Sequence, residues 1–357
     1  MTCPYDLGAI VPAGRQGHHY RLVRRVGDGA SAFVFEADRL SAKERGPRER
    51  VAFKLFRQTV SPEELQTECA ALHALAHPGI VRILSFGFTR DSLRLPYIVM
   101  PLLSGGPLRT LLDGHGALTL ARSVDYAIEM FAALETAHAV KLLHRDLRPS
   151  NIFLERIAPL IHRVVLLDFG LSPESASCVP PALGLLGHPA YAAPELFYGK
   201  PHSVGTDIYA AGLVFYEMLT GTHALGSTSH DWAYTHYFSI APPLDSLLPT
   251  APPVLIDFVA SVLAKVVRLR PPSAKACALA LSAIQEELLV PSPNSTSEDG
   301  VDSLLRRLAG PASDEDTQVE GPPSHLLRQA SNPDDTDECA PPSACNGPIS
   351  SGSPPSR

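Results

Sequence analysis

The segment from Thr206 to Gly221 carries apolar residues on nearly every side of a helix. A helix that is hydrophobic all round is buried, because none of its faces can be left in water. Gly221 closes the segment, as glycine does at many helix ends. With 357 residues, the chain can hold one large domain or two, with a sizeable core. We therefore expect a folded body with this helix in its interior.

The acidity of the chain lies in its C-terminal tail. The whole chain has 30 Lys and Arg against 37 Asp and Glu, a net charge of −7, which argues against a general nucleic-acid binder. Residues 291–357 hold 11 acidic and 4 basic residues, which leaves 26 of each sign in residues 1–290. The tail also has 11 prolines and no aromatic residue, so it buries too little surface to offset ordering and is predicted to be disordered. Val301 to Leu308 reads as one or two amphipathic turns, either a spacer or a docking peptide.

The cysteine spacing, the apolar runs and the N-terminus together indicate a protein of a reducing compartment. Six cysteines occur without a CxxC pair, so neither a disulfide scaffold nor a zinc site is indicated. No apolar run approaches the roughly 20 residues that span a bilayer, and the N-terminus lacks the pattern of a signal peptide. We expect a cytoplasmic protein without a membrane span. Residues 1–17, with two prolines and three glycines, are expected to form a flexible leader.

The stretch from His144 to Asn151, HRDLRPSN, places a carboxylate five positions ahead of a carboxamide. Asp168, Phe169 and Gly170 follow after an apolar strand. A carboxylate that can accept a hydroxyl proton, beside two oxygen ligands for a hard cation, is suited to phosphoryl transfer.

This pattern resembles the catalytic loop of the protein kinases, H-R-D-x-x-x-x-N followed by D-F-G, and looks most like the bacterial serine/threonine kinases of eukaryotic type. Matching motifs run in the family's order from Val26 to Arg270, about two thirds of the chain. The resemblance implies an α+β fold, the bilobal protein-kinase fold. A small β-rich N-lobe is expected over residues 18–103, a larger helical C-lobe over residues 104–290 and the disordered tail over residues 291–357.

The N-lobe is expected to bind ATP through a glycine-rich hairpin at Gly27 and Gly29, where small residues let backbone N–H groups approach phosphates. Ala32 replaces the family's third glycine, and an ordinary hairpin turn is the alternative reading. Adenine is expected at a hinge, on the carbonyl of Pro101, which needs no N–H there, and on the N–H of Leu103. The residues expected to line the nucleotide site are Val26, Gly27, Asp28, Gly29, Ala30, Ser31, Ala32, Phe33, Val34, Ala52, Lys54, Met100, Pro101 and Leu103.

Lys54 lies in an apolar strand, VAFKLF. Burying an ammonium group is costly unless it is paired. Its expected partner is Glu68, on a helix that begins near Ser61 and Pro62. The alternative is a lysine that reaches solvent and a glutamate on the surface.

The resemblance also implies the catalytic roles. Asp146 would orient the substrate hydroxyl and accept its proton. Asn151 and Asp168 would hold Mg²⁺, the expected cofactor beside ATP. Arg148 would contact the transferred phosphate, in a position where serine/threonine kinases usually have lysine. Lys54 completes the catalytic set with its partner glutamate, and the expected substrates are serine and threonine hydroxyls of proteins.

Structural roles follow from the same resemblance. His144 is expected to pack against Phe169 rather than act as a base. Asp207 is expected to cap the backbone of the catalytic loop. Glu195, of an A-P-E motif, is expected to pair with Arg270.

The activation segment departs from the family pattern. His188 stands in place of a threonine whose hydroxyl normally touches the catalytic Asp and Lys. Arg145 marks the subgroup in which phosphorylation often orders this segment. Ser175 and Ser177 are the available acceptors for self-phosphorylation, and a loop that needs no phosphate is the alternative.

The sequence favours an active serine/threonine protein kinase in signalling over two alternatives. A pseudokinase acting as a nucleotide-binding scaffold is suggested by the departures at Ala32, Arg148 and His188. The catalytic and metal-binding residues are nevertheless all present. A small-molecule phosphotransferase usually lacks the arginine of HRD and has no A-P-E segment.

Overall fold

The computed structural model describes residues 3–13, 18–29, 31–40, 49–57, 62–169, 188–226 and 231–289. Five side chains inside these ranges are outside the description: Glu63, Glu64, Thr67, Glu68 and Leu289. Ala30, Ser175, Ser177 and the predicted disordered tail also lie outside the described residues.

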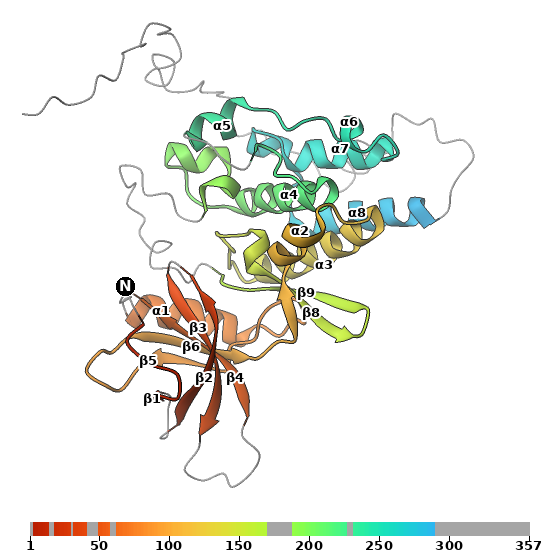
Figure 1. The fold of residues 1–357 in the computed structure, drawn as a ribbon. Helices are drawn as coiled ribbons and strands as arrows, with labels where there is room; N and C mark the ends of the chain where they lie inside the picture. The colour runs from red at the N-terminus through yellow and green to blue at the C-terminus, as the bar shows by residue number, and fades with distance from the viewer. Residues whose placement is uncertain are drawn as a thin grey trace, which may run out of the picture. The chain divides into compact units, whose positions relative to one another are not determined.

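The N-terminal part is an antiparallel six-stranded sheet with strand order β1-β2-β3-β4-β6-β5 and one long helix, α1 (Figure 1). The elements are β1 (Ile10–Pro12), β2 (His19–Asp28), β3 (Ala32–Leu40), β4 (Arg50–Phe56), α1 (Pro62–Ala74), β5 (Ser85–Phe88) and β6 (Pro96–Pro101).

Successive side chains of a strand point to opposite faces, and the apolar residues of this sheet divide accordingly. Phe33, Phe35 and Phe53 belong to one cluster, which also holds Val11 from β1. Ala32 and Ala52 belong to a second cluster, which holds the buried residues of α1 and of the helical part. The face with Ala52 is therefore the one turned toward the rest of the core.

The structure differs from the expected flexible leader at residues 3–13. Ile10 and Val11 pair with Arg21 and Tyr20 of β2, so the segment forms an edge strand of the sheet. Val11 is fully buried against the cluster on the outer face of the sheet. The prolines and glycines of this segment predicted a loose conformation. The segment is ordered as a strand because it buries apolar side chains against the outer face of the sheet. The predicted domain limits at residues 18, 103 and 290 stay predictions.

The C-terminal part is mainly helical and includes a small sheet, β7-β8-β9 (Figure 1). The strands are β7 (Gly105–Pro107), β8 (Ile152–Ala158) and β9 (Ile161–Leu166), and the 3-10 turns are η2 (Pro149–Asn151), η4 (Pro189–Tyr191), η5 (Pro194–Tyr198) and η6 (Val267–Leu269). The helices are α2 (Leu108–His115), α3 (Leu120–Ala139), α4 (Val204–Thr220), α5 (Trp232–Phe238), α6 (Leu244–Leu247), α7 (Pro253–Val262) and α8 (Ala274–Leu289). Within the ranges that the structure describes, no helix combines the length and apolarity that crossing a membrane requires.

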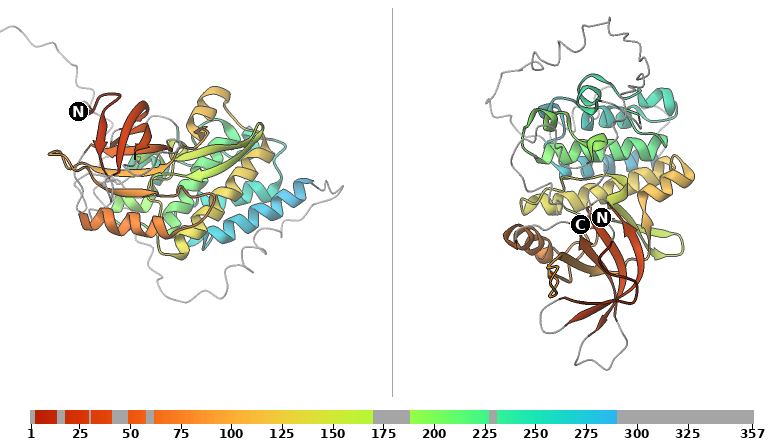
Figure 2. Two further views of the ribbon diagram at one scale, coloured as in Figure 1. Left: turned by 90° about the horizontal axis from the view of Figure 1, so that it is seen from below. Right: turned by 60° about the vertical axis from the view of Figure 1, so that its left-hand side comes forward.

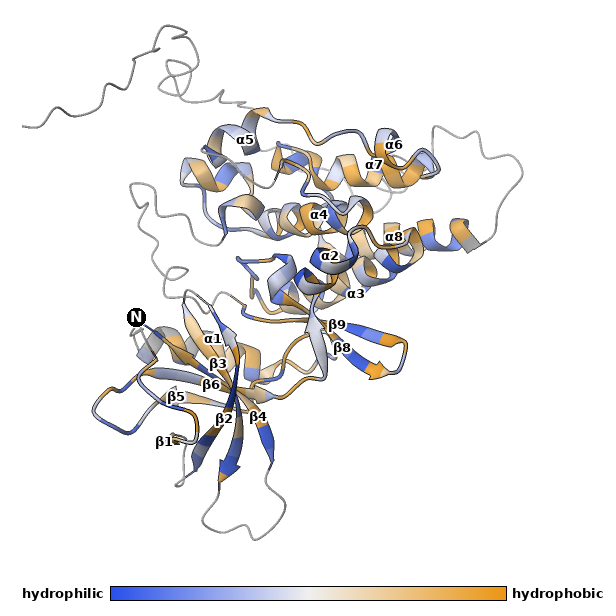
Figure 3. Ribbon diagram, in the orientation of Figure 1, coloured by the Kyte–Doolittle hydropathy of each residue, from blue (hydrophilic) through white to orange (hydrophobic). Residues whose placement is uncertain are grey.

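Helix α4 is buried along almost its whole length, as its sequence predicts. Apolar residues predominate along α4 and α7 (Figure 3). Gly221 ends α4 with a φ of 72°, and a Cβ there would lie 2.5 Å from the backbone nitrogen of Ala117. Only glycine fits this close approach without a shift of the backbone.

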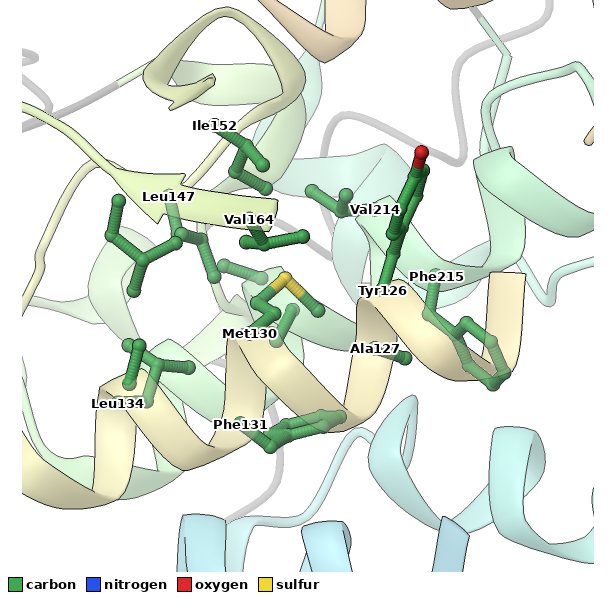
Figure 4. Packing of buried hydrophobic residues seen from close by; sticks show 14 of the residues in the cluster. Tyr126, Ala127, Met130, Phe131, Leu134, Leu147, Ile152, Val164, Val214 and Phe215 are labelled. Carbon is green, nitrogen blue, oxygen red and sulfur yellow. The ribbon is translucent and has the colours of Figure 1, made fainter. Parts of the chain in front are cut away.

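Helix α3 connects the main parts of the core. It lies beside α8 (Figure 2) and also packs against α4 and β9. Met130, Val164 and Val214 meet between α3, β9 and α4 (Figure 4). Phe131 contacts Phe258 of α7 edge to face, with ring centroids 6.3 Å apart. The loop that follows α3, from His144 onward, therefore starts from a rigid base.

Candidate active site

Asp207, in the first turn of α4, holds the backbone of the HRD loop. Its Oδ2 accepts the N–H of His144 at 2.8 Å, and its Oδ1 accepts the N–H of Arg145 at 3.0 Å. The Nε2 atom of His138 lies 2.8 Å from Oδ2. Burial raises the pKa of Asp207, but the hydrogen bond and charge of His138 outweigh it and hold the pKa below its usual range. The prediction that Asp207 caps this loop is confirmed.

His144 is a packing residue, as expected. Its ring is fully buried and its centroid lies 4.5 Å from that of Phe169. Burial lowers the pKa of His144. A ring enclosed in this way cannot reach a substrate proton, so it is not available as a general base.

Asp146 is held by residues of its own loop and by His188 from a second segment. The Nδ2 atom of Asn151 donates to Oδ2 of Asp146 at 2.9 Å and to its backbone carbonyl at 2.7 Å. The backbone N–H of His188 donates to Oδ1 at 3.0 Å. Nε of Arg148 lies 3.5 Å from Oδ2. The loss of a threonine hydroxyl at position 188 is therefore partly offset, because the backbone of the same residue reaches Asp146.

Lys54 and Asp168 meet across the two parts of the fold. Nζ of Lys54, a buried residue of β4, lies 2.6 Å from Oδ1 of Asp168, which follows β9 and has a φ of 57°. Glu68 lies on α1, but its side chain is outside the described residues. The Lys54–Glu68 pair therefore stays a prediction.

The register of the sheet places side chains that are expected to surround adenine on one face. Val34 pairs with Lys54, and Ala52 pairs with Met100, so these four side chains share one face. Leu103 packs against the same cluster from the segment after β6. Pro101, the last residue of β6, pairs with Val51, and its role at a hinge stays a prediction.

The glycine-rich hairpin forms between β2 and β3. Gly27 pairs with Val34, and the N–H of Gly29 donates to the carbonyl of Ala32 at 3.0 Å. Val26 stands at a register shift of β2 and is 43% exposed.

Phe33 is not on the face of Lys54. Its ring lies in the opposite cluster, with the guanidinium carbon of Arg57 3.8 Å from its centroid. Arg57 also donates to the carbonyl of Gly29 at 2.9 Å and pairs with Asp28. Sequence reasoning missed Arg57, since nothing in its local sequence distinguishes it from a solvent-exposed arginine.

The end of the activation segment is tied to the helical part. Arg270 donates from both terminal nitrogens to the Glu195 carboxylate, at 2.7 and 2.8 Å, which confirms that predicted pair. Glu217 of α4 accepts from Tyr191 at 2.7 Å and from Arg109 at 2.8 Å. Sequence reasoning missed Glu217, although a glutamate inside an apolar helix signals a buried partner.

Comparisons with known proteins match this chain to protein kinases. Residues 20–280 match the family model described as protein kinase domain. The chain is 29% identical over 276 residues to the probable serine/threonine-protein kinase PknB of Bifidobacterium longum, covering 72% of this chain and 38% of that protein. It is 30% identical over 292 residues to the serine/threonine-protein kinase PknA of Mycobacterium tuberculosis, covering 79% of this chain and 64% of that protein.

A solved structure is similar as well. The crystal structure of Rad53 1-466 in complex with AMP-PNP matches with a TM-score of 0.58 and 27% identity, covering 72% of this chain and 64% of that one. The chain thus spans between 38% and 64% of the length of these three proteins.

Proposed function

The chain belongs to the protein kinase family, and we propose that it transfers the γ-phosphate of ATP to serine and threonine hydroxyls of proteins. The observation that carries this proposal is the meeting of Lys54 with Asp168, at 2.6 Å, beside a catalytic loop in which Asn151 holds Asp146 at 2.9 Å. PknB and PknA are named serine/threonine-protein kinases, and the similar Rad53 structure contains AMP-PNP, an analogue of ATP.

The N-terminal part supplies the nucleotide site in this proposal. The face that carries Val34, Ala52 and Met100 receives adenine, with the carbonyl of Pro101 and the N–H of Leu103 as its hydrogen-bonding groups. The ammonium group of Lys54 binds phosphate oxygens. A buried lysine suits this role, because its charge is little screened by water.

Asp168 and Asn151 fit a Mg²⁺ ion. The Nδ2 atom of Asn151 donates to Asp146, which turns the amide oxygen of Asn151 away from that residue. Lys54 contacts Oδ1 of Asp168, and we assign Oδ2 to the ion. Mg²⁺ prefers oxygen ligands and commonly shares them with substrate phosphates. Among the described residues no group of three or more His, Cys, Asp or Glu side chains could hold a metal ion, and in this proposal Asp168 and Asn151 would hold Mg²⁺ together with the nucleotide. When bound, the ion neutralises phosphate charge.

Asp146 orients the substrate hydroxyl and accepts its proton in this mechanism. Asn151 and the N–H of His188 hold its two oxygens from opposite segments, which fixes the plane of the carboxylate. Positioned bases of this kind contribute roughly 10²- to 10⁴-fold to rate. Arg148 brings a positive charge close to Asp146 and contacts the transferred phosphate.

The proposal is tested by phosphorylation of a general protein substrate with ATP and Mg²⁺. Asp146→Asn and Lys54→Met should each lose roughly 10²-fold or more in rate, because one removes the base and the other a phosphate-binding charge. Matched controls are Asp245→Asn and Lys275→Met, at exposed positions of α6 and α8, which should retain activity. Equal labelling by wild type and both site variants would refute the proposal.

We further propose self-phosphorylation at Ser175 or Ser177, which lie outside the described residues. An added phosphate would pair with Arg145, as the family resemblance implies. Mass spectrometry after incubation with ATP should find phosphate on one of these serines. An active enzyme with neither serine modified would contradict this part.

A further inference from the structure

A cavity of about 400 Å³ lies among α3, the β8–β9 hairpin and α8, and none of the proposed catalytic residues lines it. Its wall includes Asp125, Ile128 and Glu129 of α3, Leu160 and Ile161 of the hairpin and Gln285 of α8. The cavity therefore needs an explanation of its own.

The tip of the hairpin is apolar and exposed. Leu160 is 84% exposed, Ile161 62% and Ile157 53%. Single exposed apolar residues are common on protein surfaces, but three at one tip beside a cavity indicate a surface that another element covers. The hydrophobic colour of this tip is visible in Figure 3.

The α3 side of the cavity is acidic. Asp125 and Glu129 stand one helical turn apart, and both line the cavity. Burial raises the pKa of Glu129, whose Oε2 accepts the N–H of Val164 at 2.7 Å. Arg122 is the basic residue of the α3 wall, one turn before Asp125. An occupant with an apolar face and nearby positive charge suits this surface.

The chain leaves α8 at this cavity. Gln285, one turn before the end of α8 at Leu289, donates to Asp125. At the opposite end of α8, the N–H of Lys275 donates to Glu135 at 3.0 Å. The two helices thus run antiparallel, and α8 ends near the first turns of α3. Residues 290–357 continue from this point.

We propose that residues 301–308 of this same chain dock into the cavity as a short helix. Val301, Leu304, Leu305 and Leu308 follow the i, i+3, i+4, i+7 pattern and form one apolar face. Eight helical residues extend about 12 Å, which matches the stretch of α3 from Arg122 to Glu129, also eight residues.

The apolar face of the docked helix covers Leu160 and Ile161. Arg307 borders that face and is long enough to reach Asp125 or Glu129 at its edge.

The linker permits docking within one molecule. Residues 290–300 number eleven and reach at most about 36 Å when extended, well beyond the size of the cavity. A short flexible linker gives the attached segment an effective concentration in the millimolar range. A weak contact is therefore occupied within one chain at concentrations where a second copy stays unbound.

Hydrogen–deuterium exchange of the full chain tests the docking. In the wild type, the amides of residues 305–308 should exchange roughly tenfold or more slowly than those of residues 325–328, a second leucine-containing stretch of the tail. Leu160→Asp, which alters the cavity wall, should abolish this protection. Leu305→Asp, which alters the docked segment, should abolish it too. Ile240→Asp, at a residue 86% exposed outside the cavity, and Leu327→Asp are the matched controls and should preserve it.

Three results would overturn the proposal. The first is free exchange of residues 305–308 in the wild type, and the second is protection that Leu160→Asp leaves intact. The third is protection that disappears on roughly fiftyfold dilution together with a dimer in light scattering, because an intramolecular contact does not depend on concentration. Circular dichroism of each variant confirms that the fold is retained.

Discussion

Asp207→Asn isolates the buried carboxylate that supports the catalytic loop. The substitution keeps the shape of the side chain but replaces one accepting oxygen with an NH₂ group. Asp207 accepts from His144 at 2.8 Å and from Arg145 at 3.0 Å, and His138 Nε2 lies 2.8 Å from it. If the amide oxygen keeps its contacts with the N–H of His144 and with His138, the NH₂ group faces the N–H of Arg145. The hydrogen bond from Arg145 is then lost.

The expected loss can be worked out from these contacts. A hydrogen bond to a charged group contributes about 1.5–3 kcal/mol, and the contacts that remain lose the charge that strengthens them. Arg145 also has a φ of 66°, a left-handed conformation that costs a non-glycine residue roughly 1–2 kcal/mol. Any relief of this strain in the variant offsets part of the loss, because it stabilises the folded state. We expect the free energy of unfolding to fall by about 2–4 kcal/mol in total, with a lower rate of phosphorylation because Asp146 directly follows Arg145.

Urea denaturation at pH 7 measures the first effect, beside Asp245→Asn, which should lie within about 0.5 kcal/mol of wild type. The pKa of Asp207 is depressed in the folded chain, so its stabilisation is present above the ordinary carboxyl pKa of about 3.9 and is lost as pH falls through the lower folded value. The gap between wild type and Asp207→Asn should therefore narrow below about pH 4. A variant within 0.5 kcal/mol of wild type at pH 7 would refute the reasoning.

Two further predictions concern buried groups of the helical part. Arg270→Met should lower the free energy of unfolding by about 3–5 kcal/mol, because Glu195 loses its guanidinium partner in a largely buried site. Urea denaturation measures this, and a loss below about 1 kcal/mol would contradict it. Burial lowers the pKa of His236 to about 3, so between pH 6 and pH 4 the unfolded chain binds a proton that the folded chain does not. Wild type should therefore lose stability with falling pH more steeply than His236→Phe, by up to about 1.4 kcal/mol per pH unit, and equal slopes would rule this out.

The sequence determined the fold class and the main structural contacts of the catalytic loop. The all-apolar segment that became α4 could only be buried, and the ordered motifs identified the kinase fold around it. Three contacts were predicted, since each depends on side-chain types that recur at characteristic positions. They are the hydrogen bonds from the loop backbone to Asp207, the packing of His144 on Phe169 and the ion pair of Glu195 with Arg270.

Tertiary structure decided the contacts in which backbone groups or distant faces take part. The N–H of His188 reaches Asp146, and a backbone N–H is present whatever the side chain, so the sequence carries no sign of it. The segment that contains Val11 pairs with β2, and Val11 packs against the large apolar face of the sheet. Its prolines and glycines did not predict this pairing. Arg57, the residue after β4, holds the glycine-rich hairpin from outside it. Such contacts depend on which surfaces folding brings together, and a local pattern records only the residues that supply them.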